Sequence, residues 1–381
     1  MDKIQMVDLL GQYKKIKPEV DAEMQKVIDQ TAFINGPQVK EFAQDLAEYL
    51  NVKHVIPCGN GTDALQIALM ALDLKPGDEV ITPDFTFIAT VEVVKLLGLK
   101  PVLVDVDPEL YTMDTEKLKE AITPKTKAIV PVHLYGQCAD MEEIMQVASQ
   151  NNLHVVEDVA QAIGSDYYFR NGKTVKAGTI GDIGCTSFFP SKNLGAFGDG
   201  GALFTHDDDL AEKMRMIVNH GSKVKYYHQV TGVNSRLDTL QAALLNVKLR
   251  YLNKYNEARQ QAAAIYDELF EDVDGVKTPK RAAYSNHIFH QYTLLLNKDI
   301  DRDALKAFLA ERKVPSMVYY PVPMHQQEAF LEDVAGDGHF PVSNELVDRV
   351  LSLPMHTELT REQQVYIAEQ VKEGVATLSS K

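Results

Sequence analysis

Several features that mark particular classes of protein are absent from this sequence or scarce in it. It has no tryptophan, and its three cysteines, Cys58, Cys138 and Cys185, lie far apart without a Cys-x-x-Cys pair. This spacing argues against a disulfide framework and against a thiolate metal site. We therefore expect reduced thiols and no bound metal.

Long apolar runs and an excess of basic residues are also lacking. No stretch approaches about twenty apolar residues, and the segment Met1–Val20 carries charges throughout, so neither a membrane span nor a signal peptide is expected. Lys and Arg total 39 against 54 Asp and Glu, a formal net charge of −15. Nucleic-acid binding normally shows a basic footprint. We expect a cytoplasmic protein without a nucleic-acid or membrane partner.

What the sequence does contain is a regular alternation of short β-branched runs and helical patterns. The 381 residues, 45% of them hydrophobic, suffice for two ordinary domains. Strands alternating with helices predict an α/β fold with a mainly parallel sheet covered on both faces. The predicted strands are His54–Pro57, Glu79–Thr82, Pro101–Asp105, Ala128–Val132 and Leu153–Glu157, and the helices between them are Ala64–Leu72, Ile88–Leu97, Thr115–Ala121 and Met141–Ser149.

The remaining sequence predicts one flanking helix and a second domain. A helix is expected to begin at Pro37, because proline suits the first helical position. The run Leu237–Ile265 has no Pro or Gly and predicts one long helix leading into a smaller α+β domain. We place the boundary near residue 250, with a large domain over 1–250 and a small one over 251–381. The small domain is expected to contain strands at Gln291–Leu296 and Val314–Tyr320 and helices at Asp303–Arg312 and Arg361–Leu378.

Three segments that follow predicted strands carry candidate chemistry, since open α/β sheets bind ligands at such strand ends. The first is the glycine-rich segment Gly59–Ala64, which leads into a helix. Glycine allows close backbone approach, and a helix start offers free N–H groups to a phosphate, with the Thr62 hydroxyl beside them. A plain strand-to-helix turn with Asp63 near the helix cap is an equally good interpretation of this segment alone.

The second segment is the buried strand that runs into Glu157 and Asp158. A carboxylate at the mouth of an apolar strand can keep a ring nitrogen protonated, which pyridoxal phosphate requires in order to withdraw electrons. Gln161 is placed to bond the phenolic oxygen of that cofactor if the chain turns helically there. The alternative is that Asp158 caps the next helix.

The third segment, Thr186–Gly195, places Lys192 among aromatic residues and glycines. In an apolar site the pKa of a lysine falls, which frees the amine for covalent catalysis and for general base catalysis. Ser187 and Ser191 add small hydrogen-bond donors nearby. Taken alone, Lys192 is as well explained as a solvated surface charge.

In combination, these segments resemble the DegT/DnrJ/EryC1/StrS family, the sugar-nucleotide branch of the aspartate-aminotransferase-like enzymes of pyridoxal-phosphate fold type I. The resemblance covers almost the whole chain and implies that fold, pyridoxal 5'-phosphate as cofactor and an aminotransferase activity. Dehydratase relatives carry His at the position of Lys192, so the lysine favours transamination. The similar segments, in family order, are GNGTDAL, GDEVITPDFTFIAT, PVHLYGQCADM, VVEDVAQAIG, TSFFPSKNLGAFGDGGALFT, GVNSRLDTLQAALL and LSLPMH.

The resemblance implies a role for each candidate. Lys192 would be the covalent anchor and catalytic base, Asp158 would pair with the pyridine nitrogen, and Gln161 would lie near the phenolic oxygen. Phe87 would stack on the ring, and Asn234 would reach the phosphate of the neighbouring subunit, which implies a homodimer with shared active sites. The phosphate would be held by Gly61, Thr62, Asp63 and Ser187.

Within the family, the resemblance is strongest to aminotransferases that use L-glutamate to aminate UDP-2-acetamido-2-deoxy-3-oxo-glucuronate for bacterial surface polysaccharides such as lipopolysaccharide O-antigen or capsule. Arg236 would meet the uronate carboxylate, because guanidinium and carboxylate match geometrically. Tyr319 stands where such a relative has His, which leaves other 3-keto or 4-keto sugars linked to UDP, dTDP or GDP open. The other substrate contacts would be Phe33, Ser191, Tyr319 and Tyr320.

Other interpretations stand beside these. Phe87 could belong to the core, and Asn234 could cap a helix containing Arg236. Arg236 could form a salt bridge with Asp238 or another carboxylate. A nicotinamide dehydrogenase is disfavoured because no Gly-x-Gly-x-x-Gly opens a helix after the first strands. A pyridoxal-phosphate dehydratase and a non-catalytic regulator of the same fold remain as alternatives, although the chain has no spare length for a DNA-binding module.

Overall fold

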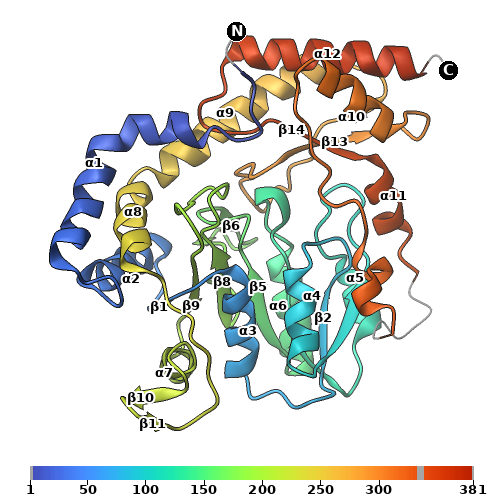
Figure 1. Cartoon of the computed structure of the whole chain (residues 1–381). Coiled ribbons are helices and arrows are strands. Elements are labelled where there is room, and N and C mark those ends of the chain that lie inside the picture. Colours follow the sequence, from blue (N-terminus) through green and yellow to red (C-terminus); the bar gives the residue numbers. More distant parts are fainter. Residues whose placement is uncertain (1–2, 333–338, 380–381) are drawn as a thin grey trace.

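A seven-stranded sheet forms the centre of the computed structural model, which describes residues 3–332 and 339–379 (Figure 1). The strand order is β1-β9-β8-β5-β4-β2-β3, and only β9 runs against its neighbours. The predicted mainly parallel sheet is therefore confirmed. The strands are β1 (His54–Cys58), β2 (Glu79–Pro83), β3 (Lys100–Val104), β4 (Thr126–Ile129), β5 (His154–Asp158), β8 (Ile183–Ser187) and β9 (Gly201–Thr205).

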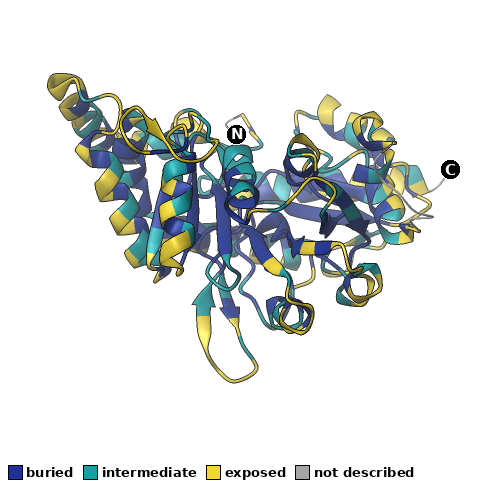
Figure 2. Ribbon diagram, turned by 90° about the horizontal axis from the view of Figure 1, so that it is seen from below, coloured by how far each residue is buried: buried dark blue, intermediate teal, exposed yellow. Residues whose placement is uncertain are grey.

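Helices cover both faces of this sheet, because successive strand side chains point to opposite faces. Val80 and Val156 pack against α3, α4 and α7, whereas Ile81 and Val155 pack against α5 and α6. This arrangement explains why the strands are apolar throughout rather than alternating. Figure 2 shows the buried strands between helices whose outer faces are exposed. These helices are α3 (Gly61–Ala71), α4 (Ala89–Leu96), α5 (Thr115–Ala121), α6 (Met141–Asn151) and α7 (Asp208–Ile217).

A helical layer stands at the β1 edge of the sheet (Figure 1). The helices α1 (Leu9–Gln30), α2 (Pro37–Leu50) and α8 (Thr239–Leu249) share a core with Val55 and Phe204. The helix beginning at Pro37 is confirmed. No sequence pattern had been assigned to α1, which is capped by the Asp8 carboxylate and contains Pro18 in its interior.

The single long helix predicted over Leu237–Ile265 is wrong, because two helices occupy this region. After α8 ends at Leu249, two residues intervene before α9 (Leu252–Phe270) begins. At the junction the Tyr251 N–H donates to the Lys248 carbonyl at 3.0 Å, a tighter turn than the α-helical pattern. No Pro or Gly marks this break, so composition did not reveal it.

The strand predicted over Val314–Tyr320 is also wrong. Only Met317 pairs with a strand, exchanging backbone hydrogen bonds with Ser352. Pro315 has no N–H to extend such a ladder. Tyr319 and Tyr320 pack instead in a cluster with residues that follow strands of the large sheet, such as Phe85 and Val132.

The C-terminal part has its own core, which contains Tyr292, Leu294 and Leu351 and to which Ile4 contributes from the N-terminus. The boundary near residue 250 stays a prediction. The predicted strand Gln291–Leu296 and helices Asp303–Arg312 and Arg361–Leu378 are confirmed, within one residue at each end. The elements here are β12 (Val276–Lys277), β13 (Tyr292–Leu296), α10 (Arg302–Glu311), α11 (Pro341–Arg349), β14 (Val350–Leu353) and α12 (Arg361–Ser379).

Short elements complete the described chain, in which no helix is long and apolar enough to cross a membrane. The five strands and four helices predicted for the first part of the sequence are confirmed, with ends that shift by at most three residues. The short elements are β6 (Asp166–Tyr168), β7 (Thr174–Lys176), β10 (Ser222–Val224), β11 (Tyr227–His228) and the 3-10 turns Leu134–Gly136, Met324–Gln326 and Glu328–Phe330.

Candidate active site

Lys192 and Asp158 come together because their strands are neighbours. Asp158 is the last residue of β5, which pairs in parallel with β8 so that Asp158 lies opposite Cys185. Lys192 lies on the loop after β8, where its N–H donates to the Phe189 carbonyl at 2.8 Å. Asp158 is buried and Lys192 is partly buried. The two side chains thus share the carboxyl edge of the sheet, where open α/β sheets bind ligands.

Burial moves both groups toward their neutral forms. It lowers the pKa of Lys192 to about 8, although the nearby charge of Asp158 acts in the opposite direction. It raises the pKa of Asp158, against the hydrogen bonds from Ala160 and Thr90 and the charges of Lys192 and His133. A lysine of this kind is partly unprotonated near neutral pH, as a nucleophilic or basic amine must be.

A buried histidine, His290, also lies close enough to Lys192 to be affected by its charge. It is buried, and no hydrogen-bond partner of its Nδ1 is found in the described part of the chain. Burial holds the pKa of His290 well below its usual range, and the positive charges of Lys192 and Arg259 lower it further. The imidazole therefore adds a polar group without adding a cation.

Asp158 is held from two sides. Its Oδ1 accepts the Ala160 N–H at 3.1 Å, and its Oδ2 accepts the hydroxyl of Thr90 at 2.9 Å. No helix follows Asp158 directly, so the helix-cap interpretation is wrong; the carboxylate closes a turn instead.

A second buried carboxylate, Glu157, precedes Asp158 in β5 and binds the neighbouring backbone. It accepts the N–H groups of Gly178, Ile180 and Gly181 at 2.9, 2.7 and 2.7 Å. It also pairs at 2.9 Å with Nε2 of His133, whose Nδ1 accepts the Ala139 N–H. The His133 backbone N–H in turn donates to the Asp158 carbonyl. Every oxygen of Glu157 is thus satisfied inside the protein.

We expect Glu157→Gln to lower the free energy of unfolding by about 1 to 3 kcal/mol. The amide would turn an N–H₂ group toward backbone donors that now meet a carboxylate oxygen. Chemical denaturation of the variant measures the loss. An unchanged free energy of unfolding would mean that this network does not support β5.

Gln161 and Tyr320 form the wall beside Asp158. The Gln161 amide oxygen accepts the Tyr135 N–H at 2.8 Å, and its nitrogen donates to the Tyr320 hydroxyl at 3.0 Å. The Tyr320 ring lies 6.0 Å from that of Phe87. Phe87 is 52% exposed, so its interpretation as a core residue is wrong. Tyr319 is joined to the same wall through its carbonyl, which accepts the Tyr135 hydroxyl.

The glycine-rich segment forms a tight cradle at the start of α3. Asn60 caps the helix by accepting the Asp63 N–H at 2.8 Å, which leaves Asp63 free of the capping role suggested for it. A Cβ on Gly61 would lie 2.7 Å from Cβ of Ser187. Only glycine therefore fits against β8 here. The first N–H groups of α3, including that of Thr62, have no acceptor within the helix and suit an anion.

Ser235 fastens a distant segment to this cradle. Its hydroxyl donates to Asp63 at 2.6 Å and accepts the Gly59 N–H at 2.8 Å. Asn234 and Arg236 flank it. Asn234 is exposed and does not cap α8, whose N-cap is Asp238. Arg236 has no carboxylate partner among residues 3–332 and 339–379, so the proposed pair with Asp238 is wrong, and its only hydrogen bond is to Asn219 at 3.3 Å.

The structure leaves two candidates without a contact to this site. Phe33 is 45% exposed, and its carbonyl accepts the Thr239 N–H at the start of α8. Ser191 lies beside Lys192 in the chain and is partly buried. Sequence reasoning missed Thr90, Ser235 and His290. For Ser235, its place between two predicted residues was a signal that could have been used.

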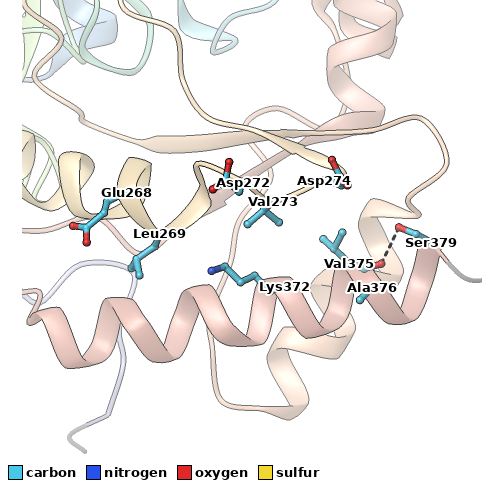
Figure 3. A pocket seen from close by; sticks show the side chains of 9 residues that line it. All are labelled: Glu268, Leu269, Asp272, Val273, Asp274, Lys372, Val375, Ala376 and Ser379. Atoms are coloured by element: carbon cyan, nitrogen blue, oxygen red, sulfur yellow. Dashed lines mark hydrogen bonds between the residues drawn. The ribbon is translucent and has the colours of Figure 1, made fainter.

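A surface hollow of about 600 Å³ lies elsewhere, between the end of α9 and α12 (Figure 3). Acidic residues of α9 and the following turn line one side of it, and Lys372 of α12 lines the other. None of the candidate residues lines this hollow, so it is separate from the Lys192 site. Its lining is Glu268, Leu269, Asp272, Val273, Asp274, Lys372, Val375, Ala376 and Ser379.

Comparison with known proteins shows the family of the chain. The sequence model of the DegT/DnrJ/EryC1/StrS aminotransferase family matches residues 14–372. The chain belongs to this family. It is therefore a pyridoxal-phosphate-dependent aminotransferase with the fold that the resemblance implied.

Relatives with assigned names align with almost the whole length of this chain. A "pleiotropic regulatory protein" of Geobacillus stearothermophilus is 49% identical over 97% of this chain and 98% of its own. A UDP-2-acetamido-2-deoxy-3-oxo-D-glucuronate aminotransferase of Pseudomonas aeruginosa is 46% identical, over 93% and 96%. A UDP-N-acetyl-3-dehydro-alpha-D-glucosamine 3-aminotransferase of Acidithiobacillus ferrooxidans is also 46% identical, over 97% of each.

Solved structures agree on the fold. A family aminotransferase from Brucella abortus is 42% identical and superimposes with a TM-score of 0.92, covering 97% of this chain and 99% of its own. NtdA from Bacillus subtilis, solved with the cofactor PMP bound, is 31% identical with a TM-score of 0.89, covering 100% and 86%.

Proposed function

We propose that this aminotransferase moves the amino group of L-glutamate to a 3-keto UDP sugar, with UDP-2-acetamido-2-deoxy-3-oxo-glucuronate as the favoured acceptor, in surface polysaccharide biosynthesis in the cytoplasm. The observation that carries the proposal is the Lys192 amine, with its lowered pKa, beside the buried Asp158 carboxylate. The relatives from P. aeruginosa and A. ferrooxidans, named for 3-oxo and 3-dehydro UDP sugars, support the acceptor class.

The residues present fit pyridoxal phosphate. The Gly61–Ser187 contact leaves room only for glycine, so the helix start can approach a phosphate closely. Phe87 offers an exposed ring face near Tyr320. The phosphate would be held at Gly61, Thr62, Asp63 and Ser187, the ring would lie against Phe87, and its nitrogen would meet Asp158.

When bound, pyridoxal phosphate supplies the electron sink that stabilises a carbanion at the carbon bearing the amino group. Lys192 Nζ would take the proton from that carbon of glutamate and later return one to the sugar carbon. Asp158 would keep the ring nitrogen protonated, and the amide nitrogen of Gln161 would donate toward the phenolic oxygen. Tyr320 orients that amide through its hydroxyl.

The pKa of Lys192 predicts how the apoprotein takes up the cofactor. Only the neutral amine attacks an aldehyde, so the rate at which Lys192 captures pyridoxal phosphate should rise about tenfold per pH unit below pH 8 and level off above it. Stopped-flow absorption between pH 6 and 10 measures this rate. A plateau already reached at pH 6 would show a much lower pKa, and a rise continuing to pH 10 would show an ordinary lysine.

Arg236 favours a uronate over a neutral sugar. Its guanidinium has no carboxylate partner in the described chain, and its buried Nε has no hydrogen-bond partner there. A carboxylate at C6 of the sugar would supply the missing partner through a charge-assisted hydrogen bond. Phe33, Ser191, Tyr319 and Tyr320 would complete the sugar pocket.

The acceptor is tested with enzyme that glutamate has already aminated. In single turnovers we expect the 3-keto uronate to react about 10- to 100-fold faster than UDP-N-acetyl-3-dehydroglucosamine, and Arg236→Gln to abolish that preference. A dTDP-linked 4-keto sugar completes the panel. If the dTDP sugar reacts fastest, the proposed acceptor is wrong while amino transfer stands.

We also propose a homodimer in which Asn234 and Arg236 serve the partner's site. Phe33, whose carbonyl accepts the N–H of Thr239 at the start of α8, and Ile34 are exposed apolar residues suited to a subunit interface. A shared site would make each subunit incomplete alone.

This sharing predicts complementation between the inactive Lys192→Ala variant and an Arg236→Ala variant weakened toward the uronate. Mixing Lys192→Ala and Arg236→Ala subunits should restore about one quarter of wild-type activity, since half of randomly paired dimers are hybrids and each hybrid has one intact site of two. Refolding the variants together and assaying amino transfer measures it. No recovery in mixtures shown by mass to contain hybrids would place both residues in one subunit's site.

A regulatory role is the second candidate, because the G. stearothermophilus relative is named a pleiotropic regulatory protein. The same Lys192 and Asp158 geometry argues for chemistry in this chain. A protein that binds the cofactor but transfers no amino group to any keto sugar would favour regulation instead.

A further inference from the structure

Thr90 lies buried beside the carboxylate proposed to meet the cofactor ring. It is fully buried in the first turn of α4, and its hydroxyl donates to Asp158 Oδ2 at 2.9 Å. The other oxygen, Oδ1, accepts the Ala160 N–H. Apart from the Ala160 backbone, Thr90 is thus the only group in the described chain that is seen to hydrogen-bond this carboxylate.

We propose that Thr90 is a positioning residue that fixes the plane of the Asp158 carboxylate for the ring nitrogen. The proposal rests on the role proposed for Asp158. A carboxylate oxygen has two lone-pair sites, so each oxygen keeps one after accepting Thr90 or Ala160. Two donors on different oxygens prevent rotation about the terminal bond, and one donor alone does not.

The same helical turn also holds Phe87, the residue proposed to stack on the cofactor ring. The Thr90 N–H donates to the Phe87 carbonyl at 3.3 Å, so the residue that would stack on the ring and the residue that holds its nitrogen partner belong to one turn. The Thr86 hydroxyl lies 3.4 Å from that of Thr90 and adds a second polar contact behind it. Thr90 thereby links Asp158, the proposed partner of the ring nitrogen, to Phe87, the proposed stacking residue.

The hydrogen bond from Thr90 also affects the charge of Asp158. The hydrogen bond from Thr90 favours the ionised form of Asp158 and lowers its pKa, against the larger effect of burial. Without the hydroxyl, the carboxyl group would hold its own proton more strongly and would be a weaker partner for a protonated ring nitrogen. Valine in place of Thr90 removes this donor at nearly constant shape, and serine keeps it.

The test compares Thr90→Val, Thr90→Ser and Asp158→Asn in the cofactor-loaded protein without any amino donor. One readout is the dissociation constant for pyridoxal phosphate, and the other is the pH midpoint of the visible band of the bound cofactor. We expect Thr90→Val to weaken binding about 10- to 100-fold and to move the midpoint in the same direction as Asp158→Asn. Thr90→Ser should resemble the wild type in both.

The outcomes separate the inference from the function on which it rests. Equal effects of Thr90→Val and Thr90→Ser, or a Thr90→Val midpoint like the wild type's beside an altered Asp158→Asn, would overturn the role of Thr90 alone. An Asp158→Asn protein that behaves like the wild type would overturn the role of Asp158 and the inference with it. Thermal unfolding of each apoprotein checks folding, and Thr90→Ala replaces Thr90→Val if the valine variant does not fold.

Discussion

Replacing Lys192 by alanine should abolish the visible absorption band of the bound cofactor and reduce amino transfer on the order of 10⁴-fold. Both effects have one cause, since the same Nζ would anchor the cofactor and move the proton. The loop that carries Lys192 follows β8 directly, and alanine fits its backbone. The expected loss is therefore chemical rather than a failure to fold, and the absorption spectrum with the single-turnover rate measures it.

Lys248 provides a matched control for this variant. It is also buried, and burial lowers its pKa to about 7. Its amine donates to the Gly195 carbonyl, whereas Lys192 has the Asp158 carboxylate nearby. Lys248→Met should keep the absorption band. If Lys248→Met loses the band and Lys192→Ala keeps it, the assignment of the anchor is wrong.

Asp158→Asn should leave the cofactor covalently attached but slow proton movement at carbon about 10²- to 10⁴-fold. The amide oxygen can still accept one of the hydrogen bonds from Thr90 and Ala160, yet it carries no charge to keep the ring nitrogen protonated. Exchange of the glutamate α-hydrogen with deuterated water, followed by mass spectrometry, isolates this step. It needs no sugar substrate.

Glu157→Gln is the control for Asp158, because it neutralises the adjacent buried carboxylate. All its hydrogen bonds go to the Gly178–Gly181 turn and to His133, so it should lose stability without losing exchange in the folded protein. Equal exchange rates for Asp158→Asn and the wild type would contradict the role of Asp158. Equal losses in both variants would point to a general disturbance of β5.

The residues that sequence alone located are those tied to a strand end. Asp158 and Lys192 follow apolar runs that predict neighbouring strands, and parallel strands bring their carboxyl ends to one edge. Their type and order also carried the family resemblance. Local pattern and chain order were enough to place both candidates at one edge of the sheet, because Asp158 ends β5 and Lys192 lies on the loop after β8.

Thr90 and Ser235 could not be found in this way. Each acts through a hydrogen bond to a residue far away in the sequence, Thr90 to Asp158 and Ser235 to Asp63, and no periodicity encodes such a pair. The break after Leu249 was hidden for a related reason. It depends on one tightened turn rather than on a Pro or Gly.

The prediction of a strand at Val314–Tyr320 was wrong because β-propensity describes side chains and not whether a neighbouring strand is available for pairing. Valine and tyrosine fit a strand, but β14 offers this segment only one paired position, at Ser352. Tertiary contacts with Tyr135 and Gln161 hold Tyr319 and Tyr320 instead. The residues proposed for the sugar pocket thus depart from regular structure where they face the site.

We propose above that this protein transfers nitrogen from glutamate to a keto sugar nucleotide. The most direct test incubates it with pyridoxal phosphate, ¹⁵N-labelled L-glutamate and UDP-2-acetamido-2-deoxy-3-oxo-glucuronate, and follows the label by mass spectrometry. We expect ¹⁵N on the sugar together with 2-oxoglutarate, and neither product with Lys192→Ala. A sugar product that has lost oxygen without gaining ¹⁵N, or unchanged substrates beside fully bound cofactor, would contradict it.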